Sequence, residues 1–494
     1  MPQQDGFSPS TSRESQFMNV LVAGAKGYVG RRLATRFLEE KGVHLRLLVA
    51  DERTLRELEG HRAEIFEGDL GDRKSLARAV RGCDIVYFPI GFFITDRIIA
   101  TQALDITRQF RDVCIDEGVK RIVYVGSFET QPAKNVLTSG ADAIGDVLCE
   151  RPDRIQTIWF RTGAFIGSGS VTFEVLRNLV QKFPLLPMPR WTDAPIDFLA
   201  VTDLVEYLVQ ARTLSEPGNE KIPIGSGRMR FQEMVRRTAE AMGLRRMIVP
   251  VPITVPRISA FLLTLATPLS WGLASYCLHI LQSPDRGEFA GDIAKCMFPG
   301  ITPLTFEEAL KTSVEELEHE HVISRWSDSL AGISYKSSKE DLARAVFRDR
   351  KEMGIGDLPP RKIFRAVETI GGNRGWFTFD LLWQVRGFLD KLAGGYGTSM
   401  GKRVESDLRI GDMVDVWKVV DLREDERLLL EAQMKVFGKA WLEFRIDGDV
   451  LVQTAYHYPK GLLGRLYWYS MLPFHIFIFK DMIRTILSLA REME

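Results

Sequence analysis

Short apolar runs alternate with helix-like segments along the first third of the chain. The runs cover residues 20–25, 45–50, 64–67, 85–90, 122–126 and 156–160, and helical periodicity fills the gaps between them. Strands that are apolar along their whole length are typical of a sheet that is buried on both faces. The alternation therefore predicts an α/β domain with a doubly wound parallel sheet covered by helices.

The pattern becomes less regular after about Gly167, where prolines and helical segments dominate. We interpret the part from about residue 168 as a substrate-side lobe of the same domain, which then spans residues 18–318. The charged stretch from Glu315 to Arg350 is typical of a solvated connection, and residues 319–345 are the predicted linker. Residues 1–17, rich in Ser, Gln and Pro, are expected to be a disordered leader.

The last part of the chain has a period of two instead. Leu428, Leu430, Ala432 and Met434 fall on one face of an extended chain, and Glu431, Gln433 and Lys435 fall on the other. A period of two recurs over residues 440–447 and 452–458. A long apolar segment follows from about residue 462 to 491. The pattern predicts consecutive antiparallel strands with one buried face and a terminal helix, an α+β domain over residues 346–494.

One stretch leaves two interpretations open. Residues 258–282 contain no Asp, Glu, Lys or Arg, and this length would be enough to cross a bilayer. Pro268 interrupts the stretch, which favours a buried pair of helices broken at the proline. Spanning or surface insertion in a membrane is the alternative.

The clearest motif is a glycine-rich loop, residues 24–30, which ends the first predicted strand and opens a helix. Its residues are Gly24, Ala25, Lys26, Gly27, Tyr28, Val29 and Gly30. Glycines there permit a tight turn and a close approach of the backbone, so that free N–H groups and the helix dipole can hold a pyrophosphate. In this context the loop predicts a dinucleotide-binding site.

The choice between NAD and NADP should depend on the end of the second strand. Asp51 favours NAD because a carboxylate there accepts the ribose hydroxyls, whereas Lys26 and Arg53 would favour the 2′-phosphate of NADP. The sequence leaves both cofactors open. Asp69 and Leu70, after the third strand, are expected to border the adenine, although an Asp in such a turn also serves as a helix cap.

Residues at the ends of two further strands complete the predicted cofactor site. They are Ile90, after the fourth strand, and Ser127, after the fifth. Ser127 has two interpretations, since a serine at a strand end can orient a substrate oxygen or only satisfy nearby backbone groups.

With these motifs the chain resembles the atypical short-chain dehydrogenase/reductase superfamily, in the branch near NmrA-like proteins and the Rossmann-type accessory subunit of respiratory complex I. The resemblance covers about residues 18–318 and rests on the glycine-rich loop and on three further blocks: residues 68–70, 121–127 and 161–170. It implies a Rossmann domain that binds NAD(H) or NADP(H).

The C-terminal part, about residues 345–494, resembles a domain of unknown function that is fused to such Rossmann domains in bacteria and is thought to share the START-like, or SRPBCC, helix-grip fold. The blocks that carry this resemblance are residues 371–376, 382–383, 386–387, 411–412 with 416–417, 439–444, and 461–469 with 473–475. The resemblance implies a fold and no reaction.

Active short-chain dehydrogenases use a Tyr and a Lys one helical turn apart, the lysine lowering the pKa of the tyrosine. Where that pair is expected, residues 139–145 read Ser-Gly-Ala-Asp-Ala-Ile-Gly, so the chain departs from the family pattern. Arg161, which is expected to follow the sixth strand at the carboxyl edge of the sheet, is a candidate for contacting a cofactor or substrate anion, and pairing with an acidic residue is the alternative.

A curved sheet packed on a long helix can leave an apolar cavity, and aromatic residues of the C-terminal part are candidates for its lining. These are Trp383, Trp417, Trp441, Tyr467 and Trp468, and packing a core is the alternative role for each. Arg386, Glu443 and His475 are the polar candidates for contacting a ligand, together with the indole of Trp441.

Composition limits the partners. Lys+Arg and Asp+Glu number 65 each, so the balance of charge gives no reason to expect nucleic acid. Five scattered cysteines without CxxC spacing fit a reducing cytoplasm, and no metal site is expected. The expected partner is a hydrophobic small molecule, with peripheral membrane contact as a further option and no protein partner identified.

The sequence thus supports three functional hypotheses. The first is an NAD(P)-dependent oxidoreductase acting on a hydrophobic small molecule that the C-terminal domain holds or delivers. The second is a non-catalytic NAD(P)H redox sensor or assembly factor, which the missing Tyr–Lys pair favours. The third is a membrane-associated lipid or quinone binder.

Overall fold

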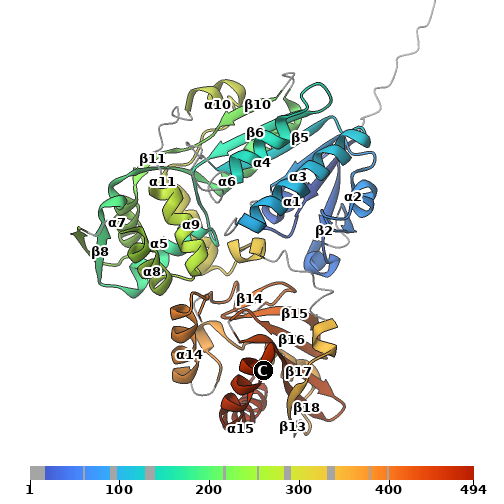
Figure 1. The fold of residues 1–494 in the computed structure, drawn as a ribbon, viewed down its shortest axis with the longest axis vertical. Coiled ribbons are helices and arrows are strands. Elements are labelled where there is room, and N and C mark those ends of the chain that lie inside the picture. Colours follow the sequence, from blue (N-terminus) through green and yellow to red (C-terminus); the bar gives the residue numbers. More distant parts are fainter. Residues whose placement is uncertain are drawn as a thin grey trace, which may run out of the picture.

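The computed structural model describes residues 17–493 apart from 59–61, 90–96, 128–139, 215–218, 253–254, 283–290, 331–339, 378–379, 398–399, 406 and 435. Two bodies follow one another in the chain, an N-terminal α/β body and a smaller C-terminal body built on an antiparallel sheet (Figure 1).

The N-terminal body contains a seven-stranded parallel sheet with the order β10-β6-β5-β4-β1-β2-β3. This confirms the predicted parallel α/β architecture. Its strands are β1 (Met18–Ala23), β2 (Val43–Val49), β3 (Ala63–Glu67), β4 (Ile85–Phe88), β5 (Arg121–Ser127), β6 (Gln156–Thr162) and β10 (Glu220–Pro223).

Each face of this sheet is covered by its own set of helices. Alternate residues of a strand belong to different clusters: Val22 packs with Leu33 on one side, and Leu21 packs with Phe110 on the other. The first face carries α1 (Tyr28–Leu38), α6 (Val201–Gln210) and α10 (Gly291–Met297), and the second carries α2 (Arg73–Val80), α3 (Arg97–Asp116) and α4 (Gly140–Cys149). Burial on both sides explains why these strands are continuously apolar.

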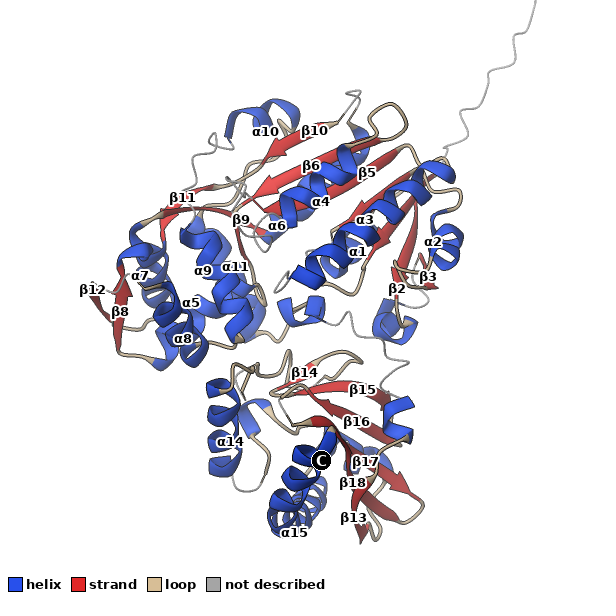
Figure 2. Ribbon diagram, viewed as in Figure 1, coloured by secondary structure: helices blue, strands red, loops and turns tan. Residues whose placement is uncertain are grey.

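The substrate-side lobe lies beside the sheet and has a core of its own (Figure 2). It holds the short strands β7 (Ala164–Ile166), β8 (Leu185–Pro189), β9 (Pro195–Ala200), β11 (Gly227–Arg230) and β12 (Met247–Val251) and the helices α5 (Val171–Lys182), α7 (Phe231–Ala241), α8 (Pro256–Ala266), α9 (Trp271–Gln282) and α11 (Phe306–Glu318). Short 3-10 turns occur at Glu52–Leu58, Arg190–Asp193 and Ala211–Thr213.

The uncharged stretch 258–282 forms two helices, α8 and α9, which pack on each other on either side of Pro268. Ala260, Leu263, Leu273 and Leu278 of this pair are buried in the lobe core. The prediction of a helix pair broken at the proline is therefore confirmed. Among the described residues, no helix combines the length and the apolar character that crossing a bilayer requires.

The C-terminal body is a six-stranded antiparallel sheet with the order β13-β18-β17-β16-β15-β14. Its strands are β13 (Phe347–Gly354), β14 (Met413–Val414), β15 (Trp417–Arg423), β16 (Arg427–Ala432), β17 (Gly438–Asp447) and β18 (Val450–Pro459), and its helices are α13 (Pro360–Glu368), α14 (Asp380–Leu392) and α15 (Gly461–Glu492), with a 3-10 turn at Gly372–Arg374. An antiparallel sheet followed by a long terminal helix was predicted. The finer helix-grip assignment stays a prediction.

One face of the C-terminal sheet packs on α15. Leu430, Leu442 and Phe444 from the sheet form a cluster with Met482 and Ile486 from the helix. These inward residues match the period of two in β16 and β17, because alternate side chains of a strand point to opposite faces.

In strand β18 the period of two does not identify the face that packs on α15. Ala455 pairs with Leu442 and belongs to the helix-facing cluster, whereas Tyr456 packs on the opposite face against Trp441. The outer face of the sheet is partly covered too, by Leu342 and Ala345, so both sides of β18 carry apolar residues.

The chain between the two bodies is not solvated throughout. Val322, Ser324 and Trp326 are buried, and so is the acidic Asp328. The expectation of a solvated connection is therefore wrong for residues 322–328, because this part of the chain packs between the lobe and the N-terminus of α1. A 3-10 turn, Trp326–Leu330, forms there.

Candidate cofactor site and ligand cavity

The glycine-rich loop joins β1 to α1 in the geometry that the motif requires. Gly24 has a φ of 68°, and its N–H donates to the carbonyl oxygen of Leu48 at 3.1 Å. The N–H of Gly27 donates to the carbonyl oxygen of Gly24 at 2.9 Å, which closes the turn. A side chain on Gly30 would overlap the carbonyl group of Gly24. The loop thus directs the N-terminus of α1 toward the carboxyl edge of the sheet, as a dinucleotide site needs.

The N–H group at the start of α1 is occupied by a residue from far along the chain. The N–H of Tyr28 donates to Oγ of Ser329 at 3.1 Å. Ser324 Oγ donates to the carbonyl oxygen of Tyr28 at 2.8 Å. Residues 324–329, which we call the covering segment, therefore lie on the first turn of α1.

The glycines and the helix N-terminus fit a dinucleotide chemically, but the space beside them is filled by the covering segment. The position that a Cβ would take on Gly27 lies 3.3 Å from Oγ of Ser329. A pyrophosphate that approached Gly27 and the N–H of Tyr28 would meet this hydroxyl first. The structure therefore describes a closed arrangement of the loop.

Lys26 lies deep in this arrangement. Burial lowers its pKa to about 7, and the positive charge of Lys418 acts in the same direction, while Asp328 and Asp412 oppose it. Gly411 of the C-terminal body packs against Cε of Lys26. A lysine of the cofactor loop thus faces groups of the C-terminal body.

The predicted ribose-binding carboxylate is already paired. Both oxygens of Asp51 accept hydrogen bonds from the guanidinium of Arg53, at 3.0 and 2.8 Å. The same guanidinium donates to Asp421 on β15 at 2.7 Å. Since Asp51 and Arg53 engage each other, their geometry favours neither NAD nor NADP.

The remaining cofactor candidates differ in what the structure says of them. Asp69 is exposed, and its side chain accepts from the N–H of Gly71 at 2.8 Å, so it stabilises a turn. The carbonyl oxygen of Leu70 accepts from the side chain of Gln109. Ser127 is the last residue of β5, and its side chain lies outside the described residues, as does the whole of Ile90.

Arg161 lies within β6 and not after it. Its Nη2 is 3.4 Å from both carboxylate oxygens of Asp142 on α4, and its guanidinium lies over the ring of Trp159. Of the two interpretations of Arg161, these contacts favour pairing with an acidic residue. Helix α4 begins at Gly140, and its sequence contains no tyrosine or lysine.

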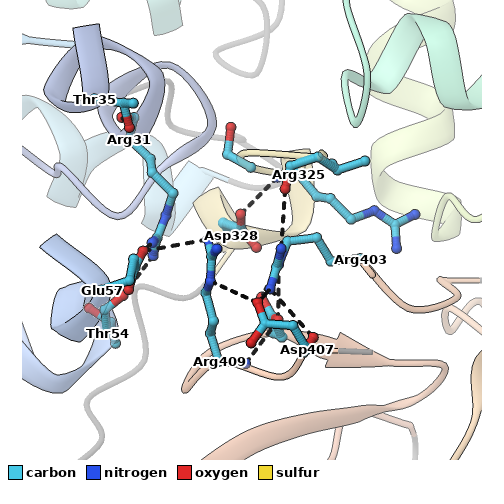
Figure 3. Close-up of polar contacts among 12 residues, drawn as sticks. Arg31, Thr35, Thr54, Glu57, Arg325, Asp328, Arg403, Asp407 and Arg409 are labelled. Carbon is cyan, nitrogen blue, oxygen red and sulfur yellow. Dashed lines mark hydrogen bonds and ion pairs between the residues drawn. The ribbon is translucent and has the colours of Figure 1, made fainter. Parts of the chain in front are cut away.

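The surface between the two bodies carries a network of charged residues, of which Arg403 and Asp412 are buried (Figure 3). Nε of Arg403 is 3.1 Å from Oδ2 of Asp412, and its Nη1 donates to the carbonyl oxygen of Val322 at 3.2 Å. Arg409 pairs at 3.5 Å with Glu57, which also pairs with Arg31 of α1. Ion pairs therefore connect the helix of the cofactor loop to the C-terminal body.

The C-terminal body holds a cavity of about 310 Å³, which we call the C-terminal cavity. Helices α14 and α15 and the inner face of the sheet line it, with aromatic side chains from all three. Among its lining residues are Trp383, Arg386, Trp417, Met434, Trp441, His457, Tyr467, Trp468, Phe474 and His475.

Arg386 and His475, two of the predicted polar residues, lie at this cavity. The guanidinium of Arg386 lies over the ring of Tyr467 at 5.1 Å. His475 stacks on Phe479 with ring centroids 4.4 Å apart, and its Nδ1 is 3.7 Å from the carboxylate of Asp349. Burial lowers the pKa of His475 to about 4, so the ring is neutral near pH 7.

Glu443 and Trp441 are arranged differently from the prediction. Glu443 is buried on the outer face of the sheet, where it accepts from Nε of Arg427 and from the hydroxyl of Tyr456, each at 2.6 Å. Its place is therefore outside the cavity lining. Trp441 borders the cavity, but it packs in the outer cluster with Val420 and Leu429.

Several polar atoms of the cavity lining have no hydrogen-bond partner among the described residues. They are Nε1 of Trp383, Nε1 of Trp417, Nδ1 of His457 and Nδ1 of His475. Both indole nitrogens are donors only. A buried donor without a partner costs about 1–3 kcal/mol, so a ligand with an acceptor atom would relieve this cost.

Sequence reasoning did not find the covering segment. The stretch Ser324-Arg325-Trp326-Ser327-Asp328-Ser329 follows a run of acidic residues and looks like more of the same linker. Its one distinguishing signal is Trp326, since a large aromatic residue is unusual in a solvated connection.

Comparisons with known proteins agree with the division of the chain. Residues 24–150 match the family model described as NAD(P)H-binding, and residues 342–482 match the model described as a protein of unknown function, DUF2867. The N-terminal part thus carries an NAD(P)H-binding domain, and the C-terminal part is a DUF2867 domain. The prediction of an NAD(P)(H) cofactor is confirmed, without a choice between the two forms.

Two curated relatives cover parts of the chain. Sterol demethylase protein B of Methylococcus capsulatus is 22% identical over 210 residues, which are 38% of this chain and 64% of that protein. The uncharacterized sugar epimerase YhfK of Bacillus subtilis is 26% identical over 121 residues, 24% of this chain and 56% of that protein. The chain spans less than two thirds of the length of either relative.

Similar solved structures match the N-terminal body. A nucleoside-diphosphate-sugar epimerase from Staphylococcus aureus gives a TM-score of 0.49 at 16% identity over 60% of this chain and 100% of that one. UDP-glucuronic acid 4-epimerase from Bacillus cereus, in complex with UDP-glucuronic acid and NAD, gives 0.46 at 14% identity over 61% and 99%.

Proposed function

We propose that this protein is an NAD(P)H-binding sensor whose C-terminal cavity takes an apolar small molecule and whose two sites influence each other. The observation that carries the proposal is the arrangement of β15. Trp417 faces the cavity, and the next residue, Lys418, acts electrostatically on Lys26 of the cofactor loop. One strand therefore borders both sites.

The lining of the cavity determines the class of ligand. Its walls are mainly apolar and aromatic, and its volume is at the lower end of the range for small-molecule pockets. The indole N–H groups of Trp383 and Trp417, which have no hydrogen-bond partner within the described part of the chain, favour a ligand that carries a hydrogen-bond acceptor, such as a carbonyl oxygen. We therefore expect a compact apolar molecule with at least one acceptor oxygen.

Coupling between the sites needs an element with two arrangements whose balance both ligands change. We propose strand β15 as this element, because a ligand against Trp417 and a nucleotide beside Lys26 would act on adjacent residues of one strand. Asp421, further along β15, also binds Arg53, the partner of Asp51. The nucleotide site and the cavity thus share the strand over residues 417–421.

The second candidate function is an NAD(P)H-dependent oxidoreductase of an apolar substrate. The relative from Methylococcus capsulatus is named for action on a sterol, which is an apolar molecule. Hydride transfer needs only a reduced nicotinamide and an oriented acceptor, so the missing Tyr–Lys pair does not by itself exclude the reaction. Oxidation of NADPH or NADH that depends on an apolar carbonyl compound would establish this candidate in place of the sensor.

A membrane contact of the C-terminal body has its own support. Large apolar side chains on α14 and on the first half of α15 are exposed around the cavity, including Val385, Phe388, Leu389, Leu466 and Phe474. Val385, Leu389 and Phe474 also line the cavity. We propose that this apolar rim lets the ligand enter from a lipid surface. Flotation of the protein with lipid vesicles, lost in Phe388→Glu, would test it.

The ligand itself is tested by native mass spectrometry of the purified chain and by titration with a fluorescent apolar probe. Ala440→Leu fills part of the cavity, whereas Arg445→Leu adds an apolar side chain to an exposed position of the same strand. We expect probe binding to be lost in Ala440→Leu and kept in Arg445→Leu. Equal binding by both variants would exclude the cavity as the ligand site.

A further inference from the structure

The covering segment is held on the cofactor loop by specific contacts and not by chance proximity. Ser324 and Ser329 bond to the carbonyl and the N–H of Tyr28, and the N–H of Trp326 donates to the carbonyl oxygen of Gly169 at 2.8 Å. The three contacts attach the segment to both sides of the carboxyl edge of the sheet, the first turn of α1 and the loop that follows β7.

The segment is also well buried. Ser324 has no exposed surface, and Trp326 is 2% exposed in the core of the lobe. Trp326 belongs to one hydrophobic cluster with residues of the N-terminal body and with Met400 and Met413 of the C-terminal body. Burial of one aromatic side chain contributes about 1.5–3 kcal/mol, so this packing makes the position of the segment stable.

The covering segment brings a negative charge to the site, as the pyrophosphate of a bound dinucleotide would. The N-terminus of a helix and a nearby lysine favour an anion. Asp328 supplies one, because it is buried and acts electrostatically on both Lys26 and Arg31. A carboxylate and a hydroxyl from the segment thus stand where the diphosphate of a dinucleotide would be recognised.

The C-terminal body holds the segment in place. Arg403 donates to the carbonyl oxygen of Val322, just before the segment, and Gly411 packs against Lys26. Arg53 of the N-terminal body reaches Asp421. A dinucleotide that displaced the segment would therefore also disturb the contact between the two bodies.

From this geometry we infer that residues 324–329 are an intramolecular occupant of the pyrophosphate position, and that NAD(P)H binding and docking of the C-terminal body on α1 exclude each other. The chain then exists in two arrangements, one closed and free of nucleotide and one open and loaded. The inference rests on NAD(P)H binding by the N-terminal domain, and it does not depend on the ligand of the C-terminal cavity.

The test is the affinity of the full chain for NADH and NADPH, followed by nicotinamide fluorescence and calorimetry. Ser324→Ala/Ser329→Ala removes both hydrogen bonds to Tyr28. Two net hydrogen bonds of about 1 kcal/mol each correspond to roughly a thirty-fold change in an equilibrium constant, so we expect the double variant to bind nucleotide about ten- to thirty-fold more tightly than the wild type.

Ser327→Ala is the matched control, because the hydroxyl of Ser327 is buried without a hydrogen-bond partner among the described residues. It should bind nucleotide like the wild type. A second readout is the radius of gyration in solution, which should increase when the wild type is saturated with the better-bound nucleotide and should stay constant in its absence.

Each result decides the question. Tighter binding in the double variant, with an unchanged Ser327→Ala, supports the inference, even where the wild type binds too weakly to measure. Equal or weaker binding in the double variant overturns it, since Ser329 would then be a neutral cap or a ligand of the cofactor. Absence of binding in all three proteins also overturns it, because removal of the segment's contacts would not have opened a site. Loss of probe binding at the cavity is a separate result and leaves this comparison unaffected.

Discussion

Arg403 offers a quantitative test of how the two bodies are held together. Its side chain is 4% exposed, and it contacts four acceptor groups at once. Two are the carboxylates of Asp412, at 3.1 Å, and Asp407, at 2.7 Å, and the others are the carbonyl oxygens of Val322, at 3.2 Å, and Asp407, at 3.4 Å. Arg403→Met keeps most of the side-chain volume and removes all of these contacts.

The expected loss of stability follows from the burial of the partner. Asp412 is 6% exposed, so the variant leaves a buried carboxylate without its guanidinium. Breaking a buried pair in this way costs about 3–5 kcal/mol. Asp412 keeps the backbone N–H of Arg409 at 3.0 Å, which places the expectation near the lower end, about 3 kcal/mol.

Urea unfolding followed by tryptophan fluorescence measures this loss as a decrease in the free energy of unfolding of the C-terminal body. The control is Arg445→Met, because Arg445 is 44% exposed and pairs with Asp447 at the surface. An exposed pair contributes less than about 1 kcal/mol, so the control should unfold like the wild type. A loss below 1 kcal/mol in Arg403→Met, or equal losses in both variants, would refute the reasoning.

Three further predictions concern other parts of the chain. A side chain on Gly145 would overlap the indole of Trp159, so Gly145→Ala should destabilise the N-terminal body by about 1–3 kcal/mol in thermal unfolding. The control is Gly300→Ala, which has open space around it and should change stability by less than about 0.5 kcal/mol. Gly27→Glu should abolish NADH binding in calorimetry by filling the loop, and retained affinity would contradict the site assignment. Burial lowers the pKa of His475 to about 4 from its usual 6.5, so the unfolded chain takes up this proton first as the pH falls. The contribution of this residue to stability should be complete well above pH 6.5 and decrease by up to about 3 kcal/mol toward pH 4, so in urea titrations His475→Asn should lose less stability than the wild type over this range.

The sequence predicted the parallel sheet because its strands are apolar on both sides. The exception is β10, the seventh strand, which was not expected. It is short, and its residues Glu220-Lys221-Ile222-Pro223 form no apolar run. As an edge strand it pairs only with β6, and polar residues and a proline are tolerated there. Only the tertiary pairing distinguishes such a segment from a loop.

The candidate residues of the C-terminal body show what a period of two leaves undetermined. Trp441 and Glu443 occupy one face of β17, and Leu442 and Phe444 occupy the other. The period separates these sets, but both faces are buried, so it cannot identify the one that meets the ligand. That choice depends on α15 and on Leu342 and Ala345, which cover opposite sides of the sheet from distant parts of the chain.

The glycine-rich loop likewise cannot reveal from local sequence which group will occupy the N-terminus of α1. The motif determines a local turn that exposes the N–H of Tyr28, and any acceptor of suitable shape can then fill the position. In this chain the acceptor comes from Ser329, 301 residues away, which no local pattern reveals.

If the covering segment competes with the dinucleotide, the measured dissociation constant equals the intrinsic one divided by the fraction of open chains. Two hydrogen bonds of about 1 kcal/mol each would keep roughly one chain in thirty open, so an apparently weak NADH site would conceal an intrinsic site about thirty-fold tighter. Weak binding by the wild type is therefore what a functional loop predicts here, and the affinity of the opened variant is the value to compare with other Rossmann domains.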